Sequence, residues 1–368
     1  MVAPHYDPEV GGVESSVRLL AEWLAARDHA VTVHTSARAM DGRLLPSGGT
    51  LGGVGIRRYP LQLDLGYFRS AFRPVLGDAD LVHLHGYGVL TNDLVARRAG
   101  RPIAFSLHHG VSMPHPTALT RLQRSLYDRL IGTPTLRRVG AVILANRQDL
   151  AWLEARRVAP KQAVVLPTPL PDEAFLPGDP ARVRREFGEA PFLLYLGRIH
   201  REKGVVEIAR ALPQLPRLEA WFAGPDAGAG RDLRAEEARL GVEGRIRLLG
   251  YVPEDTKRDL LAACTCLVLP SFHEAQGIVV AEAWAQGRPV VATRVGALPE
   301  WVEDGINGYL VPPGDPAAIA VAVARLEADP ARAVRLGGRG RERADTLRMA
   351  RLGPEYEALY ARLRGGSS

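Results

Sequence analysis

Two carboxylates and one glycine make the segment FHEAQGIVVAEA, residues 272–283, the strongest candidate for a binding site. Seven residues separate Glu274 from Glu282, and Gly277 between them marks the expected start of a helix. The free N–H groups at a helix start carry partial positive charge and attract anions such as phosphate. A glutamate inside the apolar run IVVAEAWA also needs a polar partner. We therefore expect the two carboxylates to accept hydrogen bonds from sugar and ribose hydroxyls on either side of bound phosphates.

Two cations follow another apolar run, FLLYL, in the segment GRIHREKG at residues 197–204. Open parallel sheets bind their ligands at the carboxyl ends of the strands. Arg198 offers a planar fork of donors and Lys203 a compact point charge, so the two are suited to hold two phosphate groups. The alternative interpretation is a basic loop that contacts only water.

A glycine pair, Gly11 and Gly12, precedes a further expected helix. Glycines allow the backbone to approach a ligand closely, although such a pair is also ordinary turn chemistry. His108 comes after the strand-like run IAFSL. A histidine at the end of an apolar strand is a candidate site residue, and a satisfied core histidine is equally common.

Three other patterns are not expected to carry chemistry. Asp78-Ala79-Asp80 has the form of a metal-binding motif, but it leads into an apolar strand, so no metal site is expected. Residues 52–55 (GGVG) precede a strand-like segment, which favours a hairpin loop and argues against a nicotinamide-dependent oxidoreductase. Cys264 and Cys266 lie in an apolar, strand-like run and are expected to be buried thiols, as in a protein of the reducing cytoplasm.

Short apolar runs alternate with segments of helical period along the chain, which favours parallel sheets covered by helices on both faces. Strands are expected at residues 1–4, 30–35, 81–84, 102–107, 141–144, 192–196, 218–223, 246–249, 264–269 and 289–292. Helices are expected at residues 13–26, 205–212, 278–286, 315–328, 331–347 and 354–363.

A proline-rich stretch at residues 164–180 interrupts this alternation and is interpreted as a linker. The chain is therefore predicted to be an α/β protein with two doubly wound domains, residues 1–170 and 171–350. Residues 351–368 are expected to form a C-terminal helix that packs back on the first domain.

The composition is that of an ordinary globular protein, with 368 residues, of which 46% are hydrophobic and 24% charged. Lys and Arg number 47 against 41 Asp and Glu, a net charge of +6. This modest excess suits an anionic ligand or membrane surface, and no nucleic-acid partner is expected. Since the sequence shows no signal peptide and no run of the ~18 apolar residues that a membrane span needs, the protein is expected in the cytoplasm or on the inner face of the membrane.

The stretch at residues 120–139, TRLQRSLYDRLIGTPTLRRV, predicts an amphipathic helix. Leu122, Leu126 and Leu130 are placed on one face together with Tyr127, with several arginines around them. The simpler interpretation is a surface helix that packs its leucines on the first domain. The alternative is a basic amphipathic patch that contacts anionic lipid.

Two segments together form a specific pattern. One contains Arg198 and Lys203-Gly204, and the other runs from Glu274 to Glu282. Followed by GRPVVATRVGALPEWVEDGINGYLVPPGD, they resemble the carboxyl-terminal lobe of glycosyltransferase family 4, the group 1 glycosyl transferases. HYDPEVGGVE and DADLVHLHG resemble that family's first lobe. The resemblance covers nearly the whole chain and implies a GT-B fold, in which two Rossmann-like domains face each other across a cleft. It also implies that residues 1–170 bind an acceptor and residues 171–350 a nucleotide sugar.

The resemblance implies a role for each matching residue. Arg198 and Lys203 would neutralise the diphosphate, Glu282 would hold the ribose hydroxyls and Glu274 would face the donor sugar. His108 matches the histidine near the reacting centre, with His109 beside it as an alternative. Backbone N–H groups would contact phosphate or sugar; they belong to Gly12, Gly277, Ile278 and Val279.

The activity implied is transfer of a hexose-type sugar from a nucleotide-diphosphate sugar to a glycan or lipid-linked acceptor. Retention at the anomeric carbon is implied, with no metal ion or other cofactor. The alternatives are a nucleotide-sugar epimerase or an inverting transferase on the same fold, and a non-catalytic sugar-nucleotide-binding subunit of a glycan assembly. The intact set of Arg198, Lys203, Glu274 and Glu282 argues against the non-catalytic alternative.

Overall fold

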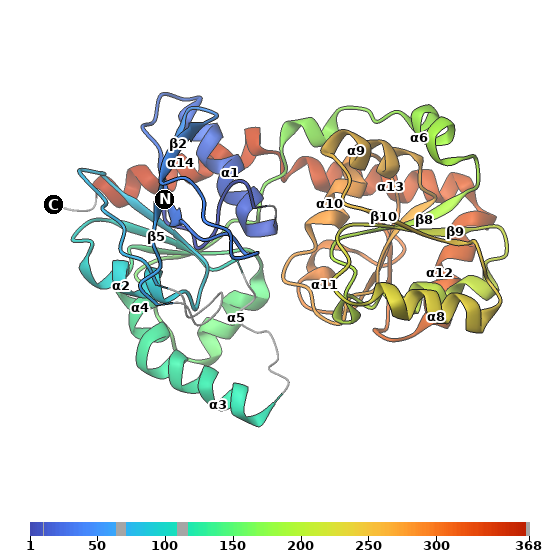
Figure 1. The fold of residues 1–368 in the computed structure, drawn as a ribbon, viewed down its shortest axis with the longest axis horizontal. Helices are drawn as coiled ribbons and strands as arrows, with labels where there is room; N and C mark the ends of the chain where they lie inside the picture. Colours follow the sequence, from blue (N-terminus) through green and yellow to red (C-terminus); the bar gives the residue numbers. More distant parts are fainter. Residues whose placement is uncertain (10, 64–70, 109–116, 366–368) are drawn as a thin grey trace. The chain divides into compact units, whose positions relative to one another are not determined.

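The computed structural model describes residues 1–9, 11–63, 71–108 and 117–365 of the chain (Figure 1). The chain divides into two compact units, the first made of Met1–Pro169 with Met349–Ser368 and the second of Leu170–Arg348. The boundary between Pro169 and Leu170 falls inside the proline-rich stretch at residues 164–180. Each unit consists of a largely parallel sheet with helices, so the predicted α/β class is confirmed.

The first unit has two groups of strands in the orders β1-β3-β2 and β4-β5-β6-β7. The strands are β1 (Thr32–Ser36), β2 (Gly48–Leu51), β3 (Val54–Tyr59), β4 (Val82–His85), β5 (Ile103–Ser106), β6 (Ala141–Leu144) and β7 (Ala163–Val165). All pairs are parallel except β2 with β3, which form the expected hairpin at Gly52 and Gly53.

Residues 1–4 were expected to form a strand, and they run beside β1 and β4 without forming a regular one. Val2 makes isolated parallel bridges to His34 of β1 and Leu84 of β4, and the N–H of Ala3 donates to the carbonyl of His34 at 3.0 Å. Val2 is fully buried, and its segment connects the two groups of strands.

The first unit's helices include one from the far end of the chain. They are α1 (Gly12–Ala25), α2 (Leu90–Arg98), α3 (Ala118–Tyr127), the π-helical η1 (Asp128–Gly132), α4 (Thr133–Arg138), α5 (Arg147–Ala155) and α14 (Met349–Gly365). α14 packs against α1, where Tyr356 and Leu359 join Leu20 and Leu24 in one apolar cluster.

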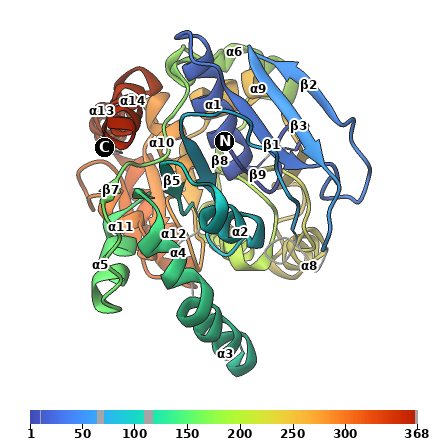
Figure 2. The same ribbon diagram turned by 90° about the vertical axis from the view of Figure 1, so that its left-hand side faces the viewer.

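The amphipathic segment differs from the simpler expectation, because its leucines do not pack on the rest of the unit. Leu122, Leu126 and Leu130 are 58%, 50% and 63% exposed, and α3 extends away from the rest of its unit (Figure 2). Tyr127 instead turns inward, where its hydroxyl donates to Oδ2 of Asp93 at 2.9 Å. The inner side of this helix is therefore held by polar and aromatic contacts, which leaves the leucines outside.

The second unit contains one parallel sheet of six strands in the order β10-β9-β8-β11-β12-β13. The strands are β8 (Phe192–Leu196), β9 (Glu219–Ala223), β10 (Ile246–Gly250), β11 (Cys266–Leu269), β12 (Val290–Thr293) and β13 (Tyr309–Val311). β8, β11 and β12 are buried along their whole length, as expected for a sheet with helices on both faces.

Helices cover both faces of this sheet (Figure 1). α9, α10 and α13 pack together on one face, and α7, α8 and α12 on the other. The α-helices are α6 (Pro180–Phe187), α7 (Val205–Ala211), α8 (Gly230–Leu240), α9 (Glu254–Ala263), α10 (Ile278–Ala285), α11 (Leu298–Trp301), α12 (Pro316–Ala328) and α13 (Pro330–Asp345). Three short 3₁₀ turns, η2 (Asp172–Phe175), η3 (Arg201–Lys203) and η4 (Leu212–Gln214), complete the unit.

The two cysteines of the second unit are buried free thiols, as expected. The expected strand at residues 264–269 is two residues too long, because Cys264 ends α9 and β11 starts at Cys266. Burial raises the pKa of both thiols, so they stay protonated and unreactive at neutral pH.

Candidate functional site

The second unit carries its candidate ligand loops at the point where the strand order reverses. The chain runs outward from β8 through β9 to β10, then returns to the other side of β8 at β11. β8 and β11 are paired in parallel, with Leu193 beside Cys266 and Leu194 beside Leu267. The loops that follow these two strands therefore leave the same edge of the sheet, where open α/β sheets bind ligands.

Backbone contacts hold these two loops together. The N–H of Phe272 donates to the carbonyl of Glu202 at 3.0 Å. Gly204 has a φ of 65°, and a Cβ at this position would overlap the carbonyl oxygen of Pro270. Glycine is therefore required at residue 204, both for its left-handed backbone and for the close approach of the second loop.

Lys203 and Glu274 form an ion pair from one loop to the other. Nζ of Lys203 lies 2.8 Å from Oε2 of Glu274, and the Ser271 hydroxyl donates to the same oxygen at 3.2 Å. The two side chains are 26% and 16% exposed, so water screens the pair less than it screens a surface ion pair. An anion that binds Lys203 would therefore share it with Glu274.

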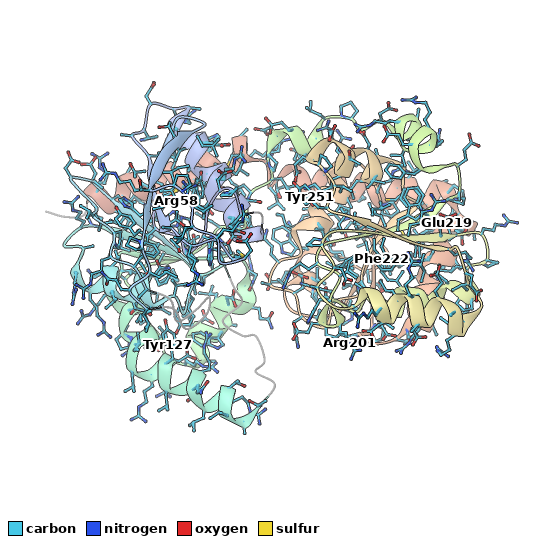
Figure 3. All side chains as sticks on the ribbon, viewed as in Figure 1. Arg58, Tyr127, Arg201, Glu219, Phe222 and Tyr251 are labelled. Carbon is cyan, nitrogen blue, oxygen red and sulfur yellow. The ribbon has the colours of Figure 1, made fainter. Side chains whose placement is uncertain are left out.

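Arg198 is exposed and keeps its charge available. In the described part of the chain, no carboxylate lies within ion-pair distance of its guanidinium. Arg201 of the same loop, labelled in Figure 3, is instead paired with α8, since its Nη2 lies 2.7 Å from Oδ1 of Asp232. Arg198 is thus a cation whose charge a bound anion can neutralise.

Tyr195, in β8, is close enough to both Arg198 and Glu274 to feel their charges. Its hydroxyl donates to the carbonyl oxygen of Arg198 at 2.8 Å. Burial raises the pKa of this hydroxyl, the Glu274 carboxylate raises it further, and the Arg198 guanidinium lowers it. Both charges act on one hydroxyl, so Arg198 and Glu274 belong to the same small region of the unit.

The amino end of α10 lies beside Glu274. Gly277 caps the helix with φ 73° and ψ 50°, and no side chain caps the N–H groups that follow, including those of Ile278 and Val279. A Cβ on Gly277 would lie 2.6 Å from Cδ2 of Leu298 and 3.3 Å from Cγ of Glu274. The helix start, with its partial positive charge, is therefore next to the Lys203–Glu274 pair.

Glu282, inside α10, has a partner that the sequence reasoning missed. Nζ of Lys257 on α9 lies 2.7 Å from Oε1 of Glu282 and 2.6 Å from Oε2 of Glu254. Burial lowers the pKa of this ammonium, but the charges of Glu282 and Glu254 outweigh burial and raise the pKa above its ordinary value. No donor among the described residues reaches the second oxygen of Glu282, Oε2. The composition offered a signal for this partner. The chain has only three lysines, and two of them, Lys203 and Lys257, pair with the two candidate glutamates.

The first unit holds the two remaining candidates, His108 and Gly12. His108 follows β5 with a φ of 55°, and its Nε2 lies 2.8 Å from Nδ1 of His85. Gly12 is the first residue of α1 and Gly11 is its N-cap. His109, the alternative to His108, lies outside the described residues.

Asp78 and Asp80 are both exposed, and Oδ2 of Asp80 lies 3.4 Å from the guanidinium of Arg364. Across residues 1–9, 11–63, 71–108 and 117–365, no group of three or more His, Cys, Asp or Glu side chains is arranged to hold a metal ion.

Family models match both units. The model described as Glycosyltransferase Family 4 matches residues 10–174, and the model described as Glycosyl transferases group 1 matches residues 190–329. The D-inositol 3-phosphate glycosyltransferase of Acidothermus cellulolyticus is 30% identical over 377 positions, covering 89% of this chain and 82% of that protein. The lipopolysaccharide core biosynthesis glycosyltransferase LpsE of Rhizobium meliloti is 39% identical over 156 residues, or 42% of this chain and 44% of that protein.

Solved structures of the same fold cover almost all of the chain. Sucrose-phosphate synthase of Thermosynechococcus elongatus has a TM-score of 0.83 at 24% identity, covering 100% of this chain and 98% of that one. Anabaena HepE in complex with UDP has a TM-score of 0.79 at 20% identity, with 98% of both chains covered. HepE has also been solved with UDP-glucose, with a TM-score of 0.78 at 19% identity and coverage of 98% and 99%.

The Lys257–Glu282 pair makes a testable contribution to stability. Lys257→Met leaves the Glu282 carboxylate, 14% exposed, without its cation and should lower the free energy of unfolding by about 1–3 kcal/mol. Adding Glu282→Leu removes the stranded charge and should restore most of the loss. Denaturant unfolding of both variants measures this, with Lys161→Met at an exposed lysine as the matched control. A Lys257→Met variant as stable as the control would show that the pair contributes nothing.

Proposed function

Since the chain belongs to glycosyltransferase family 4, we propose that it transfers a hexose-type sugar from a nucleotide-diphosphate sugar with retention and without a metal ion. The acceptor is a glycan or a lipid-linked molecule. The observation that supports this best is the arrangement at the carboxyl ends of β8 and β11, where Arg198, the Lys203–Glu274 pair and the amino end of α10 are gathered.

The diphosphate of the donor binds where these positive groups meet. Arg198 supplies an unbalanced guanidinium, while the start of α10 supplies N–H groups that no side chain caps. Lys203 adds a charge that Glu274 holds in place. The HepE complexes with UDP and UDP-glucose support a nucleotide sugar as the donor, since that protein shares the fold.

The two glutamates bind the two sugars of the donor. Glu282 uses Oε1 for Lys257, so Oε2 is left to accept hydrogen bonds from ribose hydroxyls. Glu274 is fixed by Lys203 and Ser271 next to the helix start, where it accepts from hydroxyls of the transferred sugar. Each carboxylate is thus oriented by protein partners before the donor arrives, Glu282 by Lys257 and Glu274 by Lys203 and Ser271.

Transfer breaks the bond between the anomeric carbon and a phosphate oxygen, and negative charge grows on the departing diphosphate. Fixed cations and N–H groups stabilise this charge without rearranging, which is a large source of catalysis. Arg198, Lys203 and α10 therefore take over the role that a metal ion has in other transferases. The acceptor hydroxyl attacks from the face of the leaving group and its proton passes to the leaving phosphate, so configuration is retained. His108 assists the transfer, as the family resemblance implies.

A membrane contact through α3 is consistent with a lipid-linked acceptor. Besides the three leucines described above, Leu119 is 63% exposed on the same helix. Arg121 and Arg129 are exposed on the same segment, so the surface combines apolar side chains with positive charge. An anionic lipid surface complements both features. No described helix is long and apolar enough to cross a bilayer, so this contact would be peripheral.

The reaction itself can be tested with UDP, GDP and ADP sugars in the presence of a chelator. We expect one donor class to be consumed at an unchanged rate in EDTA, and the product to keep the donor's anomeric configuration by NMR. A product of opposite configuration would show an inverting transferase. Activity that EDTA abolishes and magnesium restores would refute metal independence.

Arg198→Ala should lower kcat/KM for the donor by roughly 10²–10³, because the growing charge on the diphosphate loses a fixed cation. Arg201→Ala is the matched control, since it removes an arginine of the same loop whose partner is Asp232. Steady-state kinetics should show the control within a few-fold of wild type. Near wild-type turnover of Arg198→Ala would contradict the role of Arg198 at the diphosphate.

Replacing Leu122 and Leu126 by Glu should weaken binding to phosphatidylglycerol vesicles at least about tenfold, because each buried leucine contributes roughly 1.5–3 kcal/mol. Co-sedimentation measures this, and phosphatidylcholine vesicles test the need for negative charge. Val321→Glu with Val334→Glu, at apolar residues 50% and 72% exposed in the second unit, is the matched control. Equal binding of both double variants would rule out α3 as the contact.

A further inference from the structure

Four ring side chains form a continuous row inside the first unit, ending at His108. The Tyr360 hydroxyl on α14 lies 2.7 Å from Nδ1 of His83, whose ring centroid is 3.9 Å from that of His85. Nδ1 of His85 lies 2.8 Å from Nε2 of His108, and these two rings are stacked with centroids 5.1 Å apart. The row therefore connects the C-terminal helix to the candidate site histidine.

Strand geometry and burial fix the middle of this row. His83 and His85 are two residues apart on β4, so their side chains leave the same face of the strand, and they are 2% and 1% exposed. The side-chain amide of Asn92 donates to the carbonyls of His85 and Gly86 at 2.8 and 2.9 Å. Burial, with smaller contributions from nearby positive groups, lowers the pKa of both rings, so both are neutral near neutral pH.

A neutral His85 can pair with His108 in two ways. If His108 donated from Nε2, the hydrogen of His85 would sit on its own Nε2. That nitrogen is buried and has no hydrogen-bond partner among the described residues. A buried N–H without an acceptor is costly and rare in folded proteins. The favoured arrangement therefore places the hydrogen of His85 on Nδ1, from which it donates to Nε2 of His108.

We propose that His85 is a positioning residue, which fixes His108 as the tautomer with its hydrogen on Nδ1 and makes it a neutral hydrogen-bond donor. This rests on the proposed function only in that His108 assists sugar transfer. A neutral His108 that accepts at Nε2 carries its one N–H on Nδ1. Protonation at Nε2 would place two hydrogens between the rings, so His108 serves as a donor and not as a proton carrier.

The backbone conformation of His108 is consistent with a side chain that neighbouring residues hold in one orientation. Its φ of 55° lies in the left-handed region, which is unfavourable for a residue with a side chain. Such conformations persist where surrounding contacts fix them, and they concentrate at functional sites. The hydrogen bond from His85 is a contact that holds the ring at the end of β5.

Nuclear magnetic resonance of the full chain with nitrogen-15 histidine reads the tautomer near neutral pH, and His108→Gln assigns the signals. We expect the hydrogen on Nδ1 of His108 in the wild type. His85→Phe should release His108 to the Nε2–H form that an isolated imidazole side chain prefers. It should also lower kcat at least about tenfold with a smaller change in KM. His85→Asn can place an amide N–H where Nδ1 was, and should restore both the tautomer and most of kcat.

His34→Phe is the matched control, because His34 is a buried ring of β1 in the same unit that bonds to Tyr59 and not to the row. It should leave the His108 signals and kcat unchanged. Hydrogen on Nε2 of wild-type His108, or an unchanged tautomer in His85→Phe, would overturn the proposal. If His85→Phe does not fold, the spectra of the wild type and of His85→Asn still test the tautomer of His108. Normal turnover of His108→Gln would refute a role for His108 in transfer, whereas the spectra test its tautomer independently.

Discussion

Parallel pairing of β8 with β11 is the constraint on which the candidate site of the second unit depends. Because these strands are neighbours although β9 and β10 lie between them in sequence, their following loops start side by side. The contact between Gly204 and Pro270 then leaves no room for a side chain, and the Lys203–Glu274 pair bridges the loops. A change in this pairing would separate Arg198 from the start of α10 and leave each group an ordinary surface feature.

Charge in this region is arranged so that little of it is left unbalanced. Arg201, Lys203 and Lys257 each have a carboxylate partner, whereas the Arg198 guanidinium has none among the described residues. The three partnered cations hold loops and glutamates in position, and because each has a carboxylate partner, no charge is left unpaired by these contacts. The unbalanced cation is the group on which a bound anion can act most strongly.

Much of this could be predicted from the sequence, because alternating apolar runs and glycines report directly on strands, helices and tight turns. The start of α10 after Gly277 and the α/β class followed from such local patterns. Side-chain partners did not, since the pairing of Lys203 with Glu274 and of Lys257 with Glu282 depends on which strands and helices are neighbours. The exposure of the leucines beside Tyr127 was missed for the same reason: periodicity defines a helical face, but the contact of Tyr127 with the buried Asp93 decides which side turns inward. The row from Tyr360 to His108 joins residues from three separate parts of the chain, and no local spacing indicates it.

The position of α14 has a consequence for how the protein is made. Its residues belong to the first unit, although the entire second unit precedes them in the chain. On the ribosome, β1 to β7 emerge early, but the helix that covers Leu20 and Leu24 and supplies Tyr360 emerges only after the second unit. The first unit therefore stays incomplete, with the apolar cluster around Leu20 and Leu24 uncovered, while the second unit is synthesised and can already fold. The histidine row is therefore completed late in biosynthesis. The unit whose synthesis begins first is the unit that is completed last.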